Sequence, residues 1–291
     1  MTVTIALQLL FSGLSIGAVY ALVALAIVIP YKASGVLNFG QGEVVTLGAY
    51  IALVFTQWGV DYWLVLLGTL VVSALFGLIF ERVAIRPIVR APEFTIVIAT
   101  FAVGLIIRGA IRLYWEDNEY SLSSPFNMPP LNLGGVRLNA NFIWILVCTA
   151  FVSGSSALFF KYTRFGKAMR AVSQNRAAAR LMGIVVEHVY MTAWAISTAI
   201  GAVAGLLMAP VTGINPEIGN ILLKAIVGAV IGGFTSLSGA LVGGLVVGVI
   251  ETFSGVFIGG TFKHIAPFVV LIVVLLVRPY GFFGRAQVRR V

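Results

Sequence analysis

Residues 161–183 read KYTRFGKAMRAVSQNRAAARLMG, and long apolar stretches flank this segment on both sides. The segment has six basic residues and no Asp or Glu. A basic loop between apolar spans predicts a membrane protein and also orients it, because such loops are retained on the cytoplasmic side. The six basic residues are Lys161, Arg164, Lys167, Arg170, Arg176 and Arg180.

The second half of this loop predicts a short helix with its own start and stop. Asn175 can accept hydrogen bonds from the free amides at a helix start, and Gly183 can adopt the left-handed conformation that ends a helix. A compact helix on the cytoplasmic face predicts a partner that it contacts. Between the two ends lie Arg176, Ala177, Ala178, Ala179, Arg180, Leu181 and Met182.

The composition excludes a soluble domain. Of the 291 residues, 60% are hydrophobic and 10% are charged, and the mean hydropathy is +1.04. So few charges cannot cover the surface of a soluble protein. The net charge of +9 does not indicate nucleic-acid binding, because the cations lie between the spans rather than on one soluble face.

Cysteine and histidine usage predicts neither a disulfide framework nor a metal site. Cys148 is the single cysteine, and His188 and His264 lie far apart with no ligand spacing around either. The first basic residue is Lys32, so we expect no cleaved signal peptide and a retained first span.

The apolar segments predict an all-α polytopic membrane protein that forms a single transmembrane domain over residues 1–291. A helical span needs about 20 apolar residues. The segment 222–253 is too long for one span, and its polar run at 232–239 (GGFTSLSG) predicts a break. We therefore expect about eight or nine membrane segments, one of them broken or re-entrant. The other predicted spans are 5–30, 42–57, 62–80, 94–113, 141–160, 189–210 and 264–279.

Three basic clusters predict which loops face the cytoplasm. The central one lies in the loop 161–188, which contains the predicted short helix. The acidic, proline-containing loop at 114–140 is expected to lie outside, and the side of the N-terminus is left open. The other two clusters are Arg82, Arg86 and Arg90, and the tail residues Arg278, Arg285, Arg289 and Arg290.

Small residues recur at four-residue spacing, for example Gly13/Gly17 and Gly244/Gly248. In lipid this spacing lets helix backbones approach closely. The pattern indicates ordinary helix packing or, alternatively, smooth contacts that slide during a transport cycle.

Four residues in the segment 38–43 (NFGQGE) are candidates for a pathway or gate: Asn38, Phe39, Gln41 and Glu43. Polar side chains and two glycines at the start of a span are unfavourable in lipid, which predicts an interface or a cavity lining. Glu43 falls in the first helical turn, where the helix dipole stabilises a carboxylate. A simple capped helix start explains the same residues, and both readings stay open.

Glu251 is a candidate intramembrane charge, since it lies in a strongly apolar run and needs a partner. Lys224, Lys263 and Arg278 are the possible partners.

Arg108 and Arg112 lie four residues apart near the outer end of their span. We expect both to reach towards the acidic group Glu116, Asp117 and Glu119.

The sequence contains no phosphate-binding loop of the GxxxxGK[ST] type, no HExxH and no GxSxG. We expect no catalytic residue, no metal site and no cofactor in this chain.

The chain resembles the LivH-type permeases, the membrane subunits of branched-chain amino-acid ABC importers. The resemblance runs in order along essentially the whole chain, with two departures. One is Gln41, where many relatives have His, and the other is residues 235–238 (TSLS), where relatives often have a Gly-Ser-Ile/Leu-Pro type of turn. The segments that carry it are 38–43 with 47–50, 81–87, 164–171, 179–184, 213–216, 232–244 and 278–281.

This resemblance implies a bacterial inner-membrane permease that works in a complex. The implied partners are a second, LivM-like permease, two cytoplasmic LivG/LivF-like ATPases that bind ATP and Mg, and a periplasmic substrate-binding protein. The helix at 175–183 then resembles the coupling element that docks into an ATPase. Similar permeases carry urea, short amides or aromatic carboxylates, which are alternative substrates. An ATPase-independent carrier or channel is an alternative of another class, and it predicts paired charges near the bilayer midplane.

Overall fold

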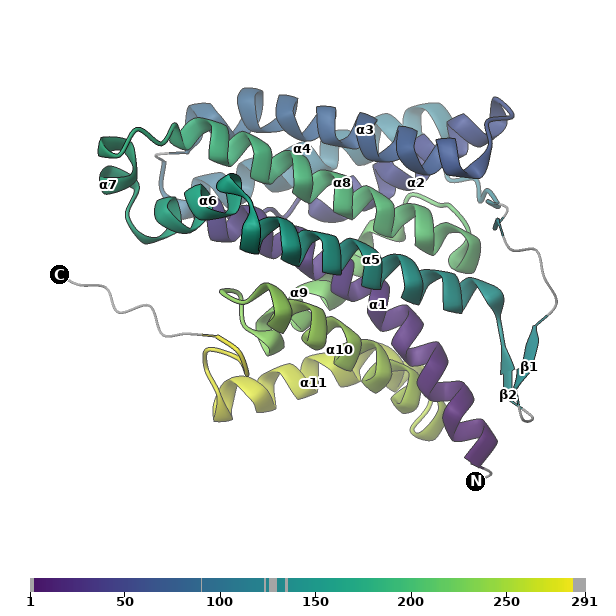
Figure 1. Cartoon of the computed structure of the whole chain (residues 1–291). Coiled ribbons are helices and arrows are strands. Elements are labelled where there is room, and N and C mark those ends of the chain that lie inside the picture. Colours follow the sequence, from purple (N-terminus) through teal and green to yellow (C-terminus); the bar gives the residue numbers. More distant parts are fainter. Residues whose placement is uncertain (1–2, 90, 123, 126–129, 134–135, 285–291) are drawn as a thin grey trace.

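The computed structural model describes residues 3–89, 91–122, 124–125, 130–133 and 136–284. Within this part, seven helices are long and apolar enough to cross a membrane, which confirms the predicted all-α polytopic class (Figure 1). They are α1 (Val3–Ser34), α3 (Tyr62–Phe80, continued by short π and 3-10 turns to Ile88), α4 (Glu93–Trp115), α5 (Ala140–Tyr162), α8 (Val186–Thr212), α10 (Leu237–Phe257) and α11 (Gly260–Val277).

Four shorter helices and a hairpin complete the described chain. Helices α2 (Gln41–Gln57) and α9 (Ile221–Gly232) lie among the long ones, and α9 follows a 3-10 turn at Ile218–Asn220. Helices α6 (Arg164–Gln174) and α7 (Arg176–Leu181) form the connection between α5 and α8. Strands β1 (Leu131–Leu133) and β2 (Val136–Leu138) pair antiparallel, with Leu131 opposite Leu138.

The predicted break in the segment 222–253 is confirmed. Helix α9 ends at Gly232, Gly233 has a φ of 101°, and α10 starts after Ser236, whose side chain accepts from Gly239 N. Carbonyl groups freed by the break accept from the C-terminal segment: Phe282 N donates to Ile231 O at 2.9 Å and Phe283 N to Gly232 O at 3.0 Å. These bonds satisfy the irregular backbone from within the protein.

Helix α1 forms the centre of the bundle. Its residues 18–29 are at most 3% exposed, because α10, α8, α9 and α5 surround it. A helix that is apolar on every side fits this position. Figure 1 shows α5 and α10 on either side of α1.

Glycines let α1 and α10 approach closely, as their four-residue spacing predicts. A Cβ atom on Gly248 would lie 2.2 Å from the Gly17 Cα atom, and one on Gly244 would lie 2.4 Å from the Ala21 Cα atom. Backbone therefore meets backbone along this contact, so no side-chain rotation could make room.

Replacing Gly248 by Val is expected to separate α1 from α10 and to destabilise the protein by at least about 1–3 kcal/mol, the usual cost of overpacking. Gly154→Val is the matched control, because a Cβ atom at Gly154 meets nothing within 4 Å. Thermal unfolding of the detergent-purified protein measures the effect. Equal midpoints for the two variants would contradict the packing argument.

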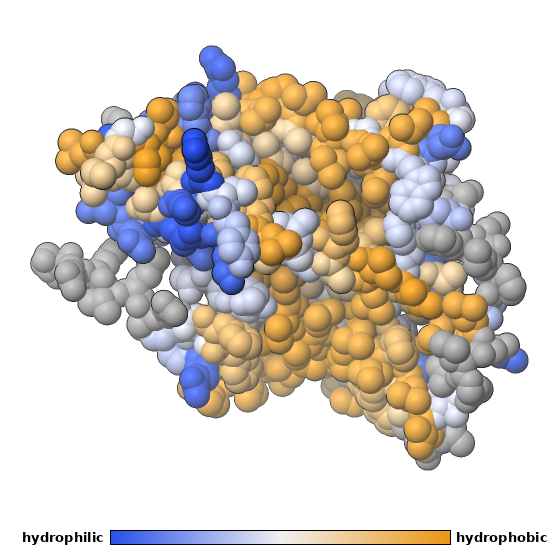
Figure 2. All heavy atoms as spheres, viewed as in Figure 1, coloured by the Kyte–Doolittle hydropathy of each residue, from blue (hydrophilic) through white to orange (hydrophobic). Residues whose placement is uncertain are grey.

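The two ends of the bundle differ in polarity. Hydrophilic residues gather over α6 and α7, and the exposed faces of α5, α10 and α11 are mainly hydrophobic (Figure 2). We call the end of the bundle that carries α7 the α7 end, and the opposite end, which carries β1 and β2, the hairpin end (Figure 1). Arg86 joins the α7 end, since its Nη2 atom lies 3.6 Å from Met191 Sδ near the start of α8. Arg90, Arg285, Arg289 and Arg290 lie outside the described residues.

Helix α1 starts at the hairpin end and finishes beside α7, which places the described start of the chain opposite α7 (Figure 1).

Candidate functional site

Helix α2 starts partway along the bundle rather than at one of its ends. After α1 ends beside α7, residues 35–40 return into the bundle. There Phe39 N donates to Oγ1 of Thr100, a residue of α4, at 3.2 Å. Gly40 allows this contact, because a Cβ atom there would lie 2.6 Å from Thr100 O. Non-helical backbone at this depth requires partners from the protein.

Asn38 supplies one such partner, because Gly40 N donates to its Oδ1 atom at 3.0 Å, and Gln41 holds Asn38 in place. Asn38 Nδ2 donates to Gln41 Oε1 at 2.9 Å, and Ser197 Oγ of α8 donates to the same oxygen at 3.2 Å. Ser197 Oγ also lies 2.5 Å from Ala26 O of α1. Asn38 and Gln41 are at most 1% exposed, so in this conformation they join α1, α2 and α8 inside the bundle.

Glu43 lies in the first turn of α2, as predicted, and forms an ion pair with Arg108. Arg108 Nε donates to Glu43 Oε1 at 3.0 Å. The expectation that Arg108 reaches towards Glu116, Asp117 and Glu119 is wrong, because α4 packs on α2 and brings Glu43 nearer. Gly104, one turn before Arg108 in α4, leaves space for the Glu43 side chain, since a Cβ atom there would lie 3.2 Å from Glu43 Cγ.

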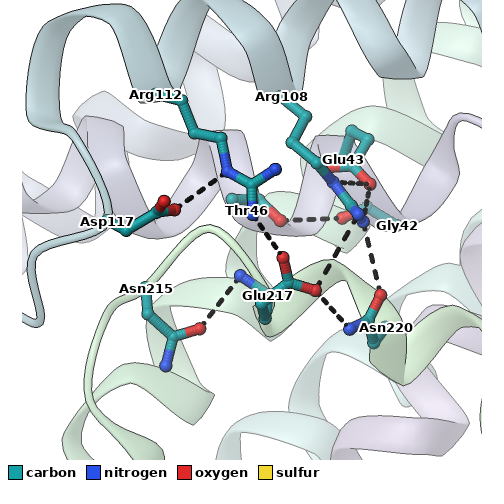
Figure 3. Close-up of polar contacts among 9 residues, drawn as sticks. All are labelled: Gly42, Glu43, Thr46, Arg108, Arg112, Asp117, Asn215, Glu217 and Asn220. Carbon is teal, nitrogen blue, oxygen red and sulfur yellow. Dashed lines mark hydrogen bonds and ion pairs between the residues drawn. The ribbon is translucent and has the colours of Figure 1, made fainter.

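Glu217 joins the same group from the connection between α8 and α9. Its Oε1 accepts from Arg112 Nη2 at 2.7 Å, and its Oε2 lies 3.8 Å from Arg108 Nη1. Arg112 also binds Asp117 at 2.9 Å, which confirms that part of the expectation. Figure 3 shows these side chains converging from α2, α4 and the α8–α9 connection. We call Glu43, Arg108, Arg112, Asp117 and Glu217 the Arg108 cluster.

The role of Glu217 could not be predicted from the sequence. Its only local signal was an irregular Asn-Pro-Glu turn, and the structure uses that turn to place the carboxylate. Asn215 Oδ1 accepts from Glu217 N at 3.0 Å, and Asn220 Nδ2 donates to Glu217 Oε2 at 2.6 Å.

Glu251 has Lys224 as its partner among the three predicted candidates, at 2.6 Å. Tyr20 Oη donates to the other carboxylate oxygen at 2.6 Å, and His264 Nδ1 lies 3.3 Å from Lys224 Nζ. These four residues, the Lys224 cluster, join α1, α9, α10 and α11. Glu251 is 2% exposed, so its charge requires both the cation and the phenol.

Tyr20→Phe removes one donor from Glu251 and is expected to destabilise the protein by about 1–3 kcal/mol, the cost of leaving a buried acceptor unpaired. Tyr114→Phe serves as the control, since Tyr114 is 79% exposed. Denaturant unfolding in detergent measures the difference. A Tyr20→Phe variant as stable as the control would show that the phenol contributes nothing to the cluster.

A hollow of about 360 Å³ lies between the two clusters. Glu217 and Asn220 line one part of it, Lys224 and His264 another, and Met208, Ile218 and Ile221 add apolar surface. Helix α9 starts at this hollow and carries Lys224 in its first turns, whereas Glu217 precedes it in the α8–α9 connection.

Helix α7 has the predicted start and stop. Asn175 Oδ1 accepts from Ala178 N at 3.0 Å, and Gly183 has a φ of 80°. Leu181 and Met182 are 89% and 83% exposed, which is unusual for large apolar side chains at a strongly charged end of the molecule.

The remaining residues of α7 hold it against its own chain. Ala179 is 4% exposed and faces the bundle, whereas Ala177 and Ala178 are exposed. Arg176 donates to the backbone carbonyl of Ser34, and Arg180 pairs with Glu187 at 2.6 Å. The helix is thus fixed on one side and presents a small apolar surface on the other.

Comparison with known proteins decides the family. Residues 9–277 match the family described as "Branched-chain amino acid transport system / permease component". The chain belongs to this family. It is a permease component of a transport system and a multi-pass membrane protein, as its apolar helices indicate.

Relatives match this permease over nearly their full length. The high-affinity branched-chain amino acid transport system permease protein LivH of Salmonella typhimurium is 32% identical, over 98% of this chain and 97% of the relative. LivH of Escherichia coli K12 gives the same values. BraD of Pseudomonas aeruginosa, another permease protein of such a system, is 33% identical over 98% of each chain.

Proposed function

We propose that this permease carries branched-chain and other hydrophobic amino acids across the bacterial inner membrane as a subunit of an ATP-driven importer. The support is the family together with the branched-chain amino-acid transport for which its full-length relatives are named. A periplasmic binding protein delivers the substrate, a second LivM-like permease completes the path, and two LivG/LivF-like ATPases bind ATP and Mg.

Helix α7 is the proposed contact with an ATPase, which places the α7 end in the cytoplasm. The observation that carries this assignment is the exposed pair Leu181 and Met182 on a helix that is fixed to its own chain from behind. Apolar side chains that lose their water on docking supply the largest share of interface energy. Closure of the ATPases would then move α7, and α5 and α8 with it, because contacts that differ between two states shift their populations.

The proposed path for the substrate lies beside the Arg108 cluster. Glu43 and Glu217 meet there, and Glu217 also lines the hollow beside α9. Asn38, Phe39 and Gln41 precede Glu43 at the start of α2, where a small rotation of α2 would change both its buried hydrogen bonds and its ion pair.

Reconstituted vesicles test the proposed function. The permease, its partner subunits and the binding protein are expected to take up labelled leucine only when ATP is hydrolysed, with urea and benzoate not accepted. Uptake of urea or benzoate instead of leucine would show that this permease carries one of those classes of solute and not hydrophobic amino acids.

The same vesicles separate a carrier from an importer. Ion pairs inside the chain, such as Lys224–Glu251, are a feature that an ion-coupled carrier also predicts. Uptake by the permease alone, driven by an ion gradient without nucleotide, would favour that second function.

A further inference from the structure

A second and larger hollow, of about 1150 Å³, opens at the α7 end. It lies between the end of α1, the α5–α6 corner, the start of α7 and the α9–α10 turn. We call it the basic groove, because four cations line it against one carboxylate, that of Glu93. The cations are Lys32, Lys161, Arg170 and Arg176.

Three of the four groove cations, Lys161, Arg170 and Arg176, make no ion pair with a carboxylate of the described residues. Arg170 and Arg176 donate to the backbone carbonyls of Phe160 and Ser34, which orient the guanidinium groups without cancelling their charge. Lys161 Nζ lies 5.1 Å from the centre of the Tyr162 ring.

The opposite rim of the groove supplies hydroxyl groups. Thr235, Ser236 and Ser238 line it at the α9–α10 turn, and Ser236 Oγ lies 3.2 Å from Ser238 Oγ. The rim also holds the start of α10, whose dipole favours an anion. Cations on one side and hydroxyl donors on the other form a setting for a phosphate group.

Apolar side chains also line the groove and lie beside it. Phe160, Val172, Leu237 and Phe283 line the groove itself. Beyond it, α5 and α10 present exposed apolar side chains such as Leu158 and Val242, 60% and 44% exposed, at a level where a membrane protein meets acyl chains.

We propose that the basic groove binds an anionic phospholipid. Its phosphate lies among Lys32, Lys161, Arg170 and Arg176, and its acyl chains follow the apolar surface between α5 and α10. Basic pockets between transmembrane helices bind anionic headgroups in this way. A lipid held there contacts the α5–α6 corner and the α9–α10 turn at once, so it connects the base of α7 to the broken helix pair.

The test measures binding of fluorescent phosphatidylglycerol to the detergent-purified permease, with fluorescent phosphatidylcholine as the neutral probe. Lys32→Gln/Lys161→Gln removes two groove cations and is expected to weaken phosphatidylglycerol binding about 30-fold, from the typical contribution of each cation near a charged lipid. Arg164→Gln/Lys167→Gln is the matched control, since it removes two exposed cations of α6 that do not line the groove. Binding by the control variant is expected to match that of the original chain.

Three results would overturn the proposal. One is equal weakening in both double variants, which would indicate a diffuse basic surface. The second is displacement of phosphatidylglycerol by millimolar inorganic phosphate, which would assign the groove to a free phosphate. The third is loss of phosphatidylglycerol binding in the complete complex with its ATPases, which would show that a protein covers the groove.

Discussion

Leu181→Asp is expected to reduce ATP-driven leucine uptake by at least about 30-fold, the effect of removing an interface residue worth 2 kcal/mol or more. Leu181 is 89% exposed in the isolated chain, so the substitution costs the permease itself little. In the assembled importer the same side chain is proposed to enter an apolar surface of the ATPase, where a carboxylate would be buried without a partner. Leucine uptake into reconstituted vesicles measures the loss, and substrate-stimulated ATP hydrolysis by the complex should fall with it.

His188→Asp is the control, because it places the same charge on an exposed position at the start of α8, outside the basic groove. This variant should retain most of the stimulated hydrolysis, and both variants should insert into the membrane in normal amounts. Unchanged substrate-stimulated ATP hydrolysis in Leu181→Asp would show that α7 is not the coupling element. The family assignment would still hold.

Arg108→Met is expected to destabilise the permease by about 3–5 kcal/mol, because it leaves the Glu43 carboxylate buried without its cation. Glu43 is 8% exposed, and one of its oxygens, Oε2, has no hydrogen-bond partner among the described residues. The charge therefore depends on Arg108 and has no second donor to replace it. Unfolding by denaturant in detergent measures the loss.

A double variant separates the ion pair from the packing of the two side chains. Glu43→Gln/Arg108→Met removes both charges and should recover most of the lost stability, because a neutral amide is far less costly to bury than an unpaired carboxylate. Arg112→Met, at a position whose side chain is 44% exposed, should lose about 1 kcal/mol or less. A double variant no more stable than Arg108→Met would contradict the electrostatic explanation.

Local patterns predicted much of the fold. Spans follow from runs of apolar residues, and both ends of α7 follow from Asn175 and Gly183, since a cap and a left-handed turn depend on neighbouring residues alone. The glycines and serines of residues 232–239 likewise predicted the break before α10. In each case the physical cause lies within a few residues of its effect.

The charged clusters could not be predicted in full, because their partners come from distant segments. Arg108 has acidic residues nearby in sequence, yet it pairs with Glu43 because α4 packs against α2. Glu217 follows an Asn-Pro pair that indicates only a turn, and the α8–α9 connection brings its carboxylate to Arg112 of α4. The apolar sequence of α2 likewise reads as a complete span and does not reveal that it starts beside Thr100.

Crosslinking from Met182 tests most directly whether an ATPase drives this permease through α7. In a Cys148→Ser background, Met182→Cys would be the only cysteine of the chain. In the co-purified complex, this cysteine labelled with benzophenone maleimide should form a photo-crosslink to an ATPase subunit. A change in crosslink yield between the ATP-bound and nucleotide-free complex is predicted. Labelling of the same cysteine from outside intact cells by a membrane-impermeant maleimide, with no crosslink to an ATPase, would contradict the account.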